Sequence, residues 1–347
     1  AQDQLKINGH AIEVRICAED TDHNFLPSTG TLAVMRAPTT SADVRLDTGV
    51  VEGDTISPFY DPMVAKLICH GANRREAAAH LAQALRDTRI AGVTVNVPYL
   101  QRIVASEPFL DADLDTRFLE RHVDILRADP AGLRIAAAIA AVHIATTPTE
   151  ATPQQHAADP WSPWGALDAW EPAGARRQPV ALKFRDDTLR QSVTPMADGS
   201  ARVTAGKETL SVRLTAQEDG RQDFAIGDRR GHAWIHRVGD TVHTWLQGEH
   251  YALLIPPVAY EATDAGHGGD CRAPMHGRIV ALLVAPGAAV KRGQPLVVME
   301  AMKMEHPICA PADGTVLEFL CAEGTLADEG VALLVFEKSP EKTAETA

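Results

Sequence analysis

The sequence predicts a multidomain chain of mixed class, with an α+β segment first and all-β segments after it. Three observations indicate this class. Strand-like and helix-like patterns alternate in the first third of the chain, short alternating strands fill residues 180–260, and the last part contains an internal duplication. At 347 residues, the chain is long enough for two or three domains of ordinary size.

Composition excludes several classes of protein. Hydrophobic residues make up 45% and charged residues 23% of the chain, which is typical of globular proteins and excludes wholesale disorder. The net charge of −13 argues against nucleic-acid binding, because such binding depends mainly on Lys and Arg. The longest apolar runs, such as residues 135–142, are far shorter than the roughly 18 to 20 residues of a membrane span. The five cysteines form no CxxC pair, which favours a reducing compartment over a disulfide framework or a zinc site.

Residues 1–123 form the predicted α+β segment. Residues 11–16 alternate with the period of a strand, and residues 63–69 are typical of a buried strand. Residues 74–89 carry apolar side chains at helical spacing, and a second, shorter helix is expected from Pro98. The chain begins without Met, inside a pattern already typical of a strand, so we expect further sequence upstream, including any targeting signal.

Residues 124–260 are predicted to combine one buried helix with an antiparallel barrel or sandwich. Asp129 can cap the helix, and Pro130 suits its first turn. Residues 133–145 are so apolar that they must be buried on most sides, and the strands that follow could enclose them. The intervening connector is rich in proline, and we expect its three tryptophans to pin it: Trp161, Trp164 and Trp170.

The last part of the chain contains a duplication. Residues 273–300 align with residues 310–337 without a gap, at an offset of 37, and ten of the 28 aligned positions are identical. Such density predicts two similar β-units, related by a pseudo-two-fold axis, that close one small core. We therefore expect residues 261–271 to be a linker, residues 272–338 a domain and residues 339–347 a tail.

Between the two repeats lies a lysine at a predicted hairpin tip. Residues 297–301 and 304–308 are typical of strands, which places Met302 and Lys303 in the turn. An amine with an ordinary pKa of about 10.4 must lose a proton before it acts as a nucleophile. An isolated lysine in a turn is usually only solvated, but the symmetric frame around Lys303 favours a modification site.

The residues around this lysine resemble a known attachment sequence. Glu300-Ala301-Met302-Lys303-Met304 is similar to the biotinylation sequence of the biotin-dependent carboxylases. The resemblance implies a flattened β-barrel biotinyl domain with biotin in amide linkage to Lys303, serving as a swinging arm. It also implies that a biotin protein ligase reads Glu300, Ala301, Met302 and Met304. Lipoyl domains usually have Asp-Lys-Ala at this tip, so lipoylation is the weaker interpretation.

The first segment resembles the C-terminal part of a biotin carboxylase domain of ATP-grasp type. The similarity lies in residues 9–20, 25–30, 60–71 and 95–103. It implies that ATP and Mg²⁺ or Mn²⁺ are bound mainly by an upstream part, with no metal in this segment. Arg45 falls where the family places an arginine that stabilises the biotin enolate, and a guanidinium can hold an oxyanion or bicarbonate through paired N–H donors. Thr116 and Arg117 match a segment that approaches the nucleotide.

The middle region resembles the domain through which carboxylase α subunits contact their carboxyltransferase partner. A helix, a tryptophan-rich entry at residues 159–165 and an antiparallel barrel carry this resemblance, with Trp161, Trp164 and Trp170 as candidate docking residues. The spacing looks most like that of 3-methylcrotonyl-CoA carboxylase α subunits. Geranyl-CoA and propionyl-CoA carboxylase α subunits are the alternatives.

Together these resemblances imply the C-terminal portion of an α subunit of a biotin-dependent acyl-CoA carboxylase. Biotin on Lys303 would be carboxylated with ATP and bicarbonate and would deliver CO2 to acyl-CoA on a carboxyltransferase β subunit. This portion alone is expected to be inactive, and a non-catalytic biotin carrier or interaction module remains an alternative. We expect a cytoplasmic protein in a bacterium and a mitochondrial-matrix protein in a eukaryote.

Other chemistry-bearing residues have structural interpretations. His232, His236 and His243 lack a further ligand for a metal and are expected to be half-exposed barrel residues. His306 is expected in a strand, and the equivalent positions of Glu300 and Glu337 in the repeats favour a shared structural role. Four cysteines with apolar neighbours are expected to be small buried residues: Cys17, Cys69, Cys309 and Cys321.

Overall fold

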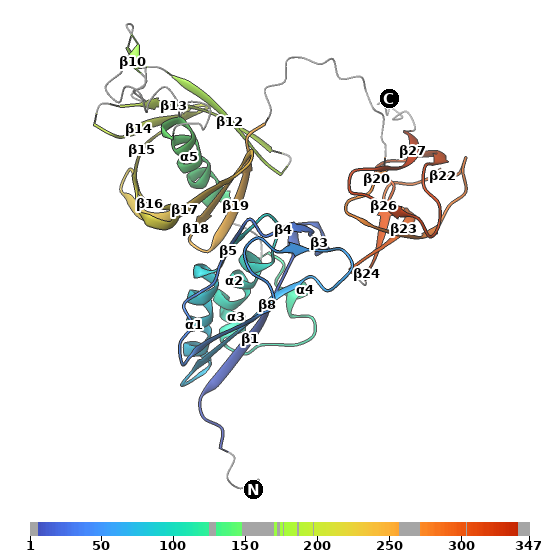
Figure 1. Cartoon of the computed structure of the whole chain (residues 1–347), viewed down its shortest axis with the longest axis horizontal. Coiled ribbons are helices and arrows are strands. Elements are labelled where there is room, and N and C mark those ends of the chain that lie inside the picture. Colours follow the sequence, from blue (N-terminus) through green and yellow to red (C-terminus); the bar gives the residue numbers. More distant parts are fainter. Residues whose placement is uncertain are drawn as a thin grey trace, which may run out of the picture. The chain divides into compact units, whose positions relative to one another are not determined.

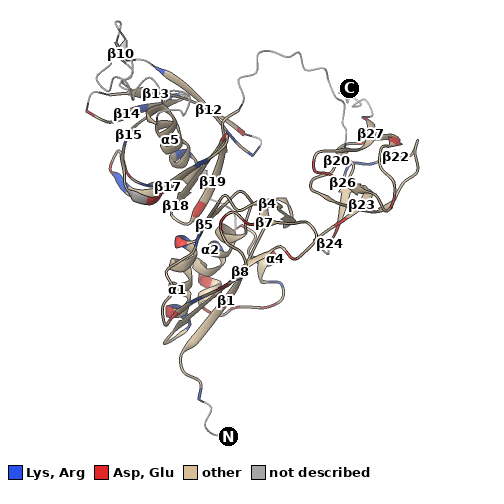
Figure 2. Ribbon diagram, viewed as in Figure 1, with Lys and Arg blue, Asp and Glu red and all other residues tan. Residues whose placement is uncertain are grey.

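The computed structural model describes residues 6–124, 130–147, 170–171, 174–175, 177–185, 187–196, 198–256, 271–302 and 304–338 (Figure 1). The chain divides into two compact units. One comprises residues 1–84, 90–100 and 259–347, and the other comprises residues 85–89 and 101–258. No helix in the described part is long and apolar enough to cross a membrane. Lys and Arg are interspersed with Asp and Glu along the elements (Figure 2).

A three-stranded antiparallel sheet organises the first segment. Its order is β1 (His10–Cys17), β8 (Met63–Gly71) and β6 (Val44–Thr48). Alternate side chains point to one face, where Ile16 and Leu67 are fully buried, as the period of the sequence predicts. Helix α1 (Arg74–Asp87) follows β8 and buries Leu81. This helix is shorter than predicted because Arg89 already begins strand β9, which pairs with β5.

The remaining elements of this segment are short. They are β2 (Glu19–Asp20), a 3-10 turn (Thr21–His23), β3 (Leu26–Pro27), β4 (Gly30–Thr31), β5 (Val34–Arg36), β7 (Thr55–Ile56), β9 (Arg89–Ala91), α2 (Val97–Ala105), α3 (Glu107–Leu110) and α4 (Phe118–Arg121). The α+β class predicted for this segment is confirmed.

A closed eight-stranded barrel surrounds helix α5 (Pro130–Thr146), as Figure 1 shows. Its strands follow chain order: β12 (Gln178–Phe184), β13 (Asp187–Pro195), β14 (Ala201–Ala205), β15 (Glu208–Ala216), β16 (Arg221–Ile226), β17 (Arg229–Val238), β18 (Thr241–Leu246) and β19 (Glu249–Leu254). Two further short strands, β10 (Trp170–Glu171) and β11 (Gly174–Ala175), pair with each other. The structure thus decides between the two predicted architectures in favour of a barrel.

The barrel core explains the composition of α5. Residues 136–141 of the helix are all buried, and five of these six are alanines. They form one core with inward-facing strand residues such as Leu182, Val212 and Leu253. Small side chains let the strands approach a central helix on every side, so a helix that is apolar all round is the expected solution.

The last segment consists of two four-stranded sheets. One has the order β20 (Cys271–Arg272), β27 (Ala332–Lys338), β25 (Gly314–Phe319) and β22 (Ala289–Val290). The other has the order β24 (Met304–Cys309), β23 (Pro295–Ala301), β21 (Gly277–Leu282) and β26 (Leu326–Ala327). Their facing sides share one core that includes Ile279, Leu296, Met299, Val316 and Leu333.

The register of the sheets reproduces the duplication residue by residue. Gly277 pairs with Ala327, and the equivalent Gly314 pairs with Val290. The pairing of β21 with β23 shifts between Ile279 and Ala281, and that of β25 with β27 shifts between Val316 and Glu318, the equivalent positions. Gly314 also pairs with Lys338 at the end of β27. The predicted pair of symmetric β-units is therefore present.

Candidate functional site

The hairpin of β23 and β24 ends in a two-residue connection. Ala301 pairs with Met304, so Met302 and Lys303 alone join the two strands. Met302 has a φ of 47°, the left-handed conformation that two-residue hairpin turns favour at their first central position. Lys303 itself lies outside the described residues. The strands expected on either side of the lysine are both present.

The residues beside the lysine differ in exposure. Ala301 and Met302 are buried, at 4% and 3% exposure, whereas Glu300 and Met304 are exposed. An enzyme that approaches this hairpin can therefore meet Glu300 and Met304 directly, and would sense the other two through the shape of the turn. That a ligase recognises these four residues stays a prediction.

A second candidate site lies on the outward face of the sheet in the first segment. Arg45 belongs to the edge strand β6 and is 73% exposed. Its Nε donates to Oδ1 of Asp47 at 2.9 Å, and its Nη2 donates to Oδ2 of the same carboxylate at 3.0 Å. This hydrogen bonding raises the pKa of Arg45 and lowers the pKa of Asp47. The two groups form a stable ion pair, and part of the guanidinium stays open to solvent.

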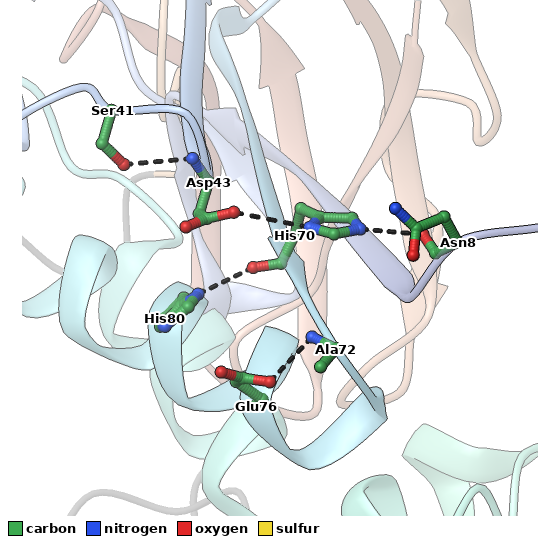
Figure 3. Close-up of polar contacts among 7 residues, drawn as sticks. All are labelled: Asn8, Ser41, Asp43, His70, Ala72, Glu76 and His80. Atoms are coloured by element: carbon green, nitrogen blue, oxygen red, sulfur yellow. Dashed lines mark hydrogen bonds and ion pairs between the residues drawn. The ribbon is translucent and has the colours of Figure 1, made fainter.

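His70 of β8 lies on the same outward face (Figure 3). No motif in the sequence indicates a role for this histidine. Its Nε2 lies 2.9 Å from the backbone carbonyl of Asn8, and its Nδ1 lies 3.4 Å from Oδ1 of Asp43. Both partners accept hydrogen bonds, and they raise the pKa of the ring, the carbonyl of Asn8 most strongly. Asp43 and His70 are 27 residues apart, so only the register of the sheet could have revealed them.

Thr116 and Arg117 are exposed residues in the turn that precedes α4. The backbone N–H of Arg117 donates to Oδ1 of Asp115 at 2.9 Å. This hydrogen bond shapes the turn, and within the described residues no contact joins either residue to a further charged partner. Their approach to a nucleotide therefore remains a prediction.

Of the three candidate docking tryptophans, Trp161 and Trp164 lie outside the described residues, and so does the side chain of Trp170 in β10. The barrel instead places Trp245 of β18 beside two histidines, with its ring stacked on that of His250 at 4.8 Å between centroids. His243 lies 3.0 Å from His250, measured from Nδ1 to Nε2.

No group of three or more His, Cys, Asp or Glu residues suited to a metal ion occurs in the described part of the chain. His232 and His236 are exposed, but His243 is buried at 7% exposure, contrary to the half-exposed position expected for it. Its side chain is covered although it belongs to the outward row of β18. His306 belongs to β24, as expected, and burial lowers its pKa.

The prediction for the cysteines is partly wrong. Cys69 is buried and Cys17 and Cys321 are partly buried, but Cys309 is exposed. Cys309 is the last residue of β24, the edge strand of its sheet. Because side chains alternate between the two faces of a strand, the side chain of Cys309 points away from the core. Its apolar neighbours in the sequence do not indicate which face it occupies.

Comparisons with known proteins agree with these features. Residues 13–121 match the family described as the biotin carboxylase C-terminal domain, and residues 269–336 match the family described as biotin-requiring enzyme. The first match includes Arg45, and the second includes the hairpin.

Curated relatives match almost the whole chain. The mitochondrial methylcrotonoyl-CoA carboxylase subunit alpha of Dictyostelium discoideum is 34% identical over 328 residues, which cover 91% of this chain and 47% of that protein. The corresponding subunit of Arabidopsis thaliana is 30% identical, with 96% and 50% covered. The mitochondrial propionyl-CoA carboxylase alpha chain of Mus musculus is 30% identical, with 97% and 47% covered. The chain therefore spans about half the length of the curated relatives it matches. The chain thus contains a segment of the biotin carboxylase C-terminal family and a segment of the biotin-requiring enzyme family, and almost its whole length is similar to the α subunits of acyl-CoA carboxylases.

Proposed function

We propose that this chain carries biotin on Lys303 and works within a complete acyl-CoA carboxylase, most similar to the methylcrotonoyl-CoA enzymes. The observation that carries the proposal is the hairpin, in which Met302 and Lys303 alone connect two strands of a duplicated β-domain. The biotin carboxylase segment in the same chain supports an enzyme over a free-standing carrier module.

The described residues suit such an attachment. The connection is short, Met302 adopts the left-handed conformation, and exposed Glu300 and Met304 flank the lysine in the sequence. Biotin, in amide linkage to the amine of Lys303, would supply the ring nitrogen that accepts a carboxyl group from bicarbonate. The turn holds the attachment point at the end of a rigid hairpin, and the core beneath it keeps the hairpin in place.

Arg45 supports the carboxylation half of the proposal. Its guanidinium is exposed, charged at every physiological pH and already fixed on one side by Asp47. Such a group can hold an oxyanion through its remaining N–H donors. ATP and Mg²⁺ or Mn²⁺ would bind mainly through other parts of the whole subunit.

We propose in addition that the barrel of residues 124–260 contacts a carboxyltransferase β subunit on which acyl-CoA is carboxylated. The relatives named methylcrotonoyl-CoA and propionyl-CoA carboxylase support this pairing, and the 34% identity to the methylcrotonoyl-CoA subunit of Dictyostelium discoideum, against 30% to the propionyl-CoA chain of Mus musculus, favours the first substrate. These relatives are named mitochondrial, which supports the mitochondrial matrix as the location in a eukaryote and leaves the cytoplasm as our expectation for a bacterium.

The test of biotin attachment is a streptavidin blot after coexpression of the chain with a biotin protein ligase. Lys303→Arg retains the charge but removes the primary amine that can be acylated, so labelling is expected to disappear. Lys338→Arg, in the same domain, is the matched control and should label like the wild type. Labelling of the Lys303→Arg variant would contradict the assignment.

The test of the partner and the substrate uses the complete α subunit. Copurification should recover a carboxyltransferase subunit, and the complex should carboxylate methylcrotonyl-CoA faster than geranyl-CoA or propionyl-CoA. Trp164→Ala should reduce recovery of the partner at an unchanged melting temperature if this tryptophan anchors the contact. Faster turnover of propionyl-CoA would reassign the substrate, and a complete subunit without bicarbonate-dependent ATP cleavage would favour the carrier module.

A further inference from the structure

The outward face of the first sheet arranges its charged residues in two cross-strand rows. In one row, Arg45 of β6 and Glu13 of β1 lie on either side of Ile68 of β8. In the next row, Asp47 of β6 and Arg15 of β1 lie on either side of Lys66 of β8. Residues in register share a face of the sheet, so these side chains all project outward. Acidic and basic side chains therefore lie close together around Arg45.

Asp47 accepts two hydrogen bonds from the Nε–Nη2 edge of the Arg45 guanidinium. Its two oxygens accept from Nε and Nη2, at 2.9 and 3.0 Å. A guanidinium has five N–H donors in one plane, so this arrangement leaves both N–H bonds of Nη1 and one of Nη2 unused by Asp47. The free edge between Nη1 and Nη2 can still bind an anion with two parallel hydrogen bonds while Asp47 stays in place.

Asp47 is in turn held by Lys66. The ammonium of Lys66 lies 3.9 Å from Oδ2 of Asp47 and 3.6 Å from Oε2 of Glu13, so it bridges the two carboxylates. Lys66 comes from the central strand of the sheet, whose backbone is paired on both sides. The carboxylate that accepts from the arginine thus also faces a cation that belongs to the central strand.

Stability does not account for this arrangement. Exposed ion pairs contribute little to folding because water screens them and because long side chains lose entropy when they are held. Both partners are accessible, with exposures of 73% for Arg45 and 37% for Asp47. What the arrangement does provide is a single direction for the guanidinium of an otherwise flexible side chain.

We propose that Asp47 is a positioning residue that orients Arg45, with Lys66 as its support, so that the free edge of the guanidinium meets the oxyanion of the carboxylation reaction. This inference rests on the proposed role of Arg45. In this proposal Asp47 acts only through the arginine, because its two oxygens occupy the Nε–Nη2 edge of the guanidinium and leave the neighbouring Nη1–Nη2 edge to the oxyanion.

The first test examines the pair in this chain by NMR of the arginine side chains. In the wild type, the two-point contact should slow rotation about the Nε–Cζ bond of Arg45 and separate its Nη signals. In Asp47→Asn, these signals should collapse to the averaged signal of a solvated arginine, while Glu13→Gln should leave them separate. Averaged signals in the wild type, or separate signals in Asp47→Asn, would overturn the proposal.

The second test measures bicarbonate-dependent biotin carboxylation by the complete subunit. Asp47→Asn should lower kcat roughly 10- to 100-fold, as expected when a reacting group loses its orientation, with the KM for ATP and the melting temperature unchanged. Asp47→Glu keeps the carboxylate and should recover part of the loss. Glu13→Gln is the matched control, because Glu13 shares Lys66 but does not contact Arg45 in the described structure.

The Arg45→Lys variant separates the proposed role of Arg45 from the proposed role of Asp47. If this variant keeps full activity, the proposed role of Arg45 fails, and the role of Asp47 fails with it. If Arg45→Lys is strongly impaired while Asp47→Asn is not, Arg45 keeps its role and the positioning role of Asp47 is overturned. Impairment of both, with an intact Glu13→Gln variant, supports the whole proposal.

Discussion

At the residue scale, two glycines allow the strands of the last domain to approach each other closely. Gly277 and Gly314 occupy equivalent positions of the two repeats and both have ordinary negative φ. A Cβ on Gly277 would lie 2.8 Å from the carbonyl oxygen of Glu300, and a Cβ on Gly314 would meet the carbonyl oxygen of Glu337 even more closely. Glu300 and Glu337 are themselves equivalent. The absence of a side chain therefore allows the same close crossing of strands in each half.

We predict that Gly314→Ala lowers the free energy of unfolding of this domain by about 1–3 kcal/mol, since the added methyl group overlaps backbone that cannot move without breaking the sheet. Gly277→Ala should cost less, because its contact is less severe. Gly49→Ala is the control, because its new methyl group meets nothing within 4 Å. Chemical denaturation of the three variants measures the effect, and an unchanged Gly314→Ala variant would contradict the explanation.

The sequence could predict residues whose role follows from local pattern. Lys303 follows from the hairpin between repeats, whereas Arg45 follows only from the family resemblance of its segment. Asp47 stands two residues farther along the same face of β6, and nothing in the local pattern distinguishes it. Its partner Lys66 and the pair of Asp43 with His70 depend on register between distant strands, which no local pattern reports.

At the element scale, the barrel contains one element that local pattern predicts well and one that it predicts poorly. The sequence predicts α5 because residues 133–145 are apolar on every side, and the barrel indeed surrounds it. Strand β13 is poorly predicted by hydrophobic alternation, because its large apolar residues are only Leu189 and Val193 among polar neighbours. Closure of the barrel supplies partners on both of its edges, so tertiary pairing makes a strand where hydrophobic alternation is weak.

Strands β18 and β19 carry a histidine pair that should make the barrel sensitive to acid. Burial lowers the pKa of His243 to about 4 and that of His250 to about 3, with further contributions from His236 and from His243, respectively. In the unfolded chain, each pKa returns to about 6.5, so the unfolded state binds more protons below that value. The stabilisation is therefore fully present above pH 6.5 and is lost as the pH falls toward 3.

We predict that His250→Gln makes the acid dependence of barrel unfolding shallower between pH 6 and pH 4, because one buried titrating group is removed. Each unit by which the pKa is lowered corresponds to about 1.4 kcal/mol at most, so the change in slope is measurable. Denaturation at a series of pH values tests this. His232→Gln, an exposed barrel histidine, should keep the wild-type slope; identical slopes for both variants would sink the account.

At the scale of the whole molecule, we predict that residues 271–338 fold alone. The domain begins one residue earlier than the sequence predicts, because Cys271 belongs to β20 and to the core rather than to the linker. Each repeat is completed by the other, because Gly277 of the first pairs with Ala327 of the second and Gly314 pairs with Val290. A recombinant 271–338 fragment should give dispersed amide signals and one cooperative melt. Residues 271–309, which contain a single repeat with the hairpin, should remain unfolded. A molten 271–338 fragment would show that the boundary or the shared core is wrong.

The register of the duplicated domain shows which of its parts lie at opposite ends. Lys338, where the chain leaves the last strand, pairs with Gly314, which pairs with Val290. From Val290, the turn closed by Lys291 and Gln294 leads into Pro295, the end of β23 opposite Met302. The exit of β27 and the Met302 end of the hairpin therefore lie at opposite ends of the domain, separated by the seven residues of β23, or roughly 20 Å. If biotin is attached at Lys303, a small rotation of the domain about its Lys338 end would move the biotin over a long path without any deformation of the domain itself.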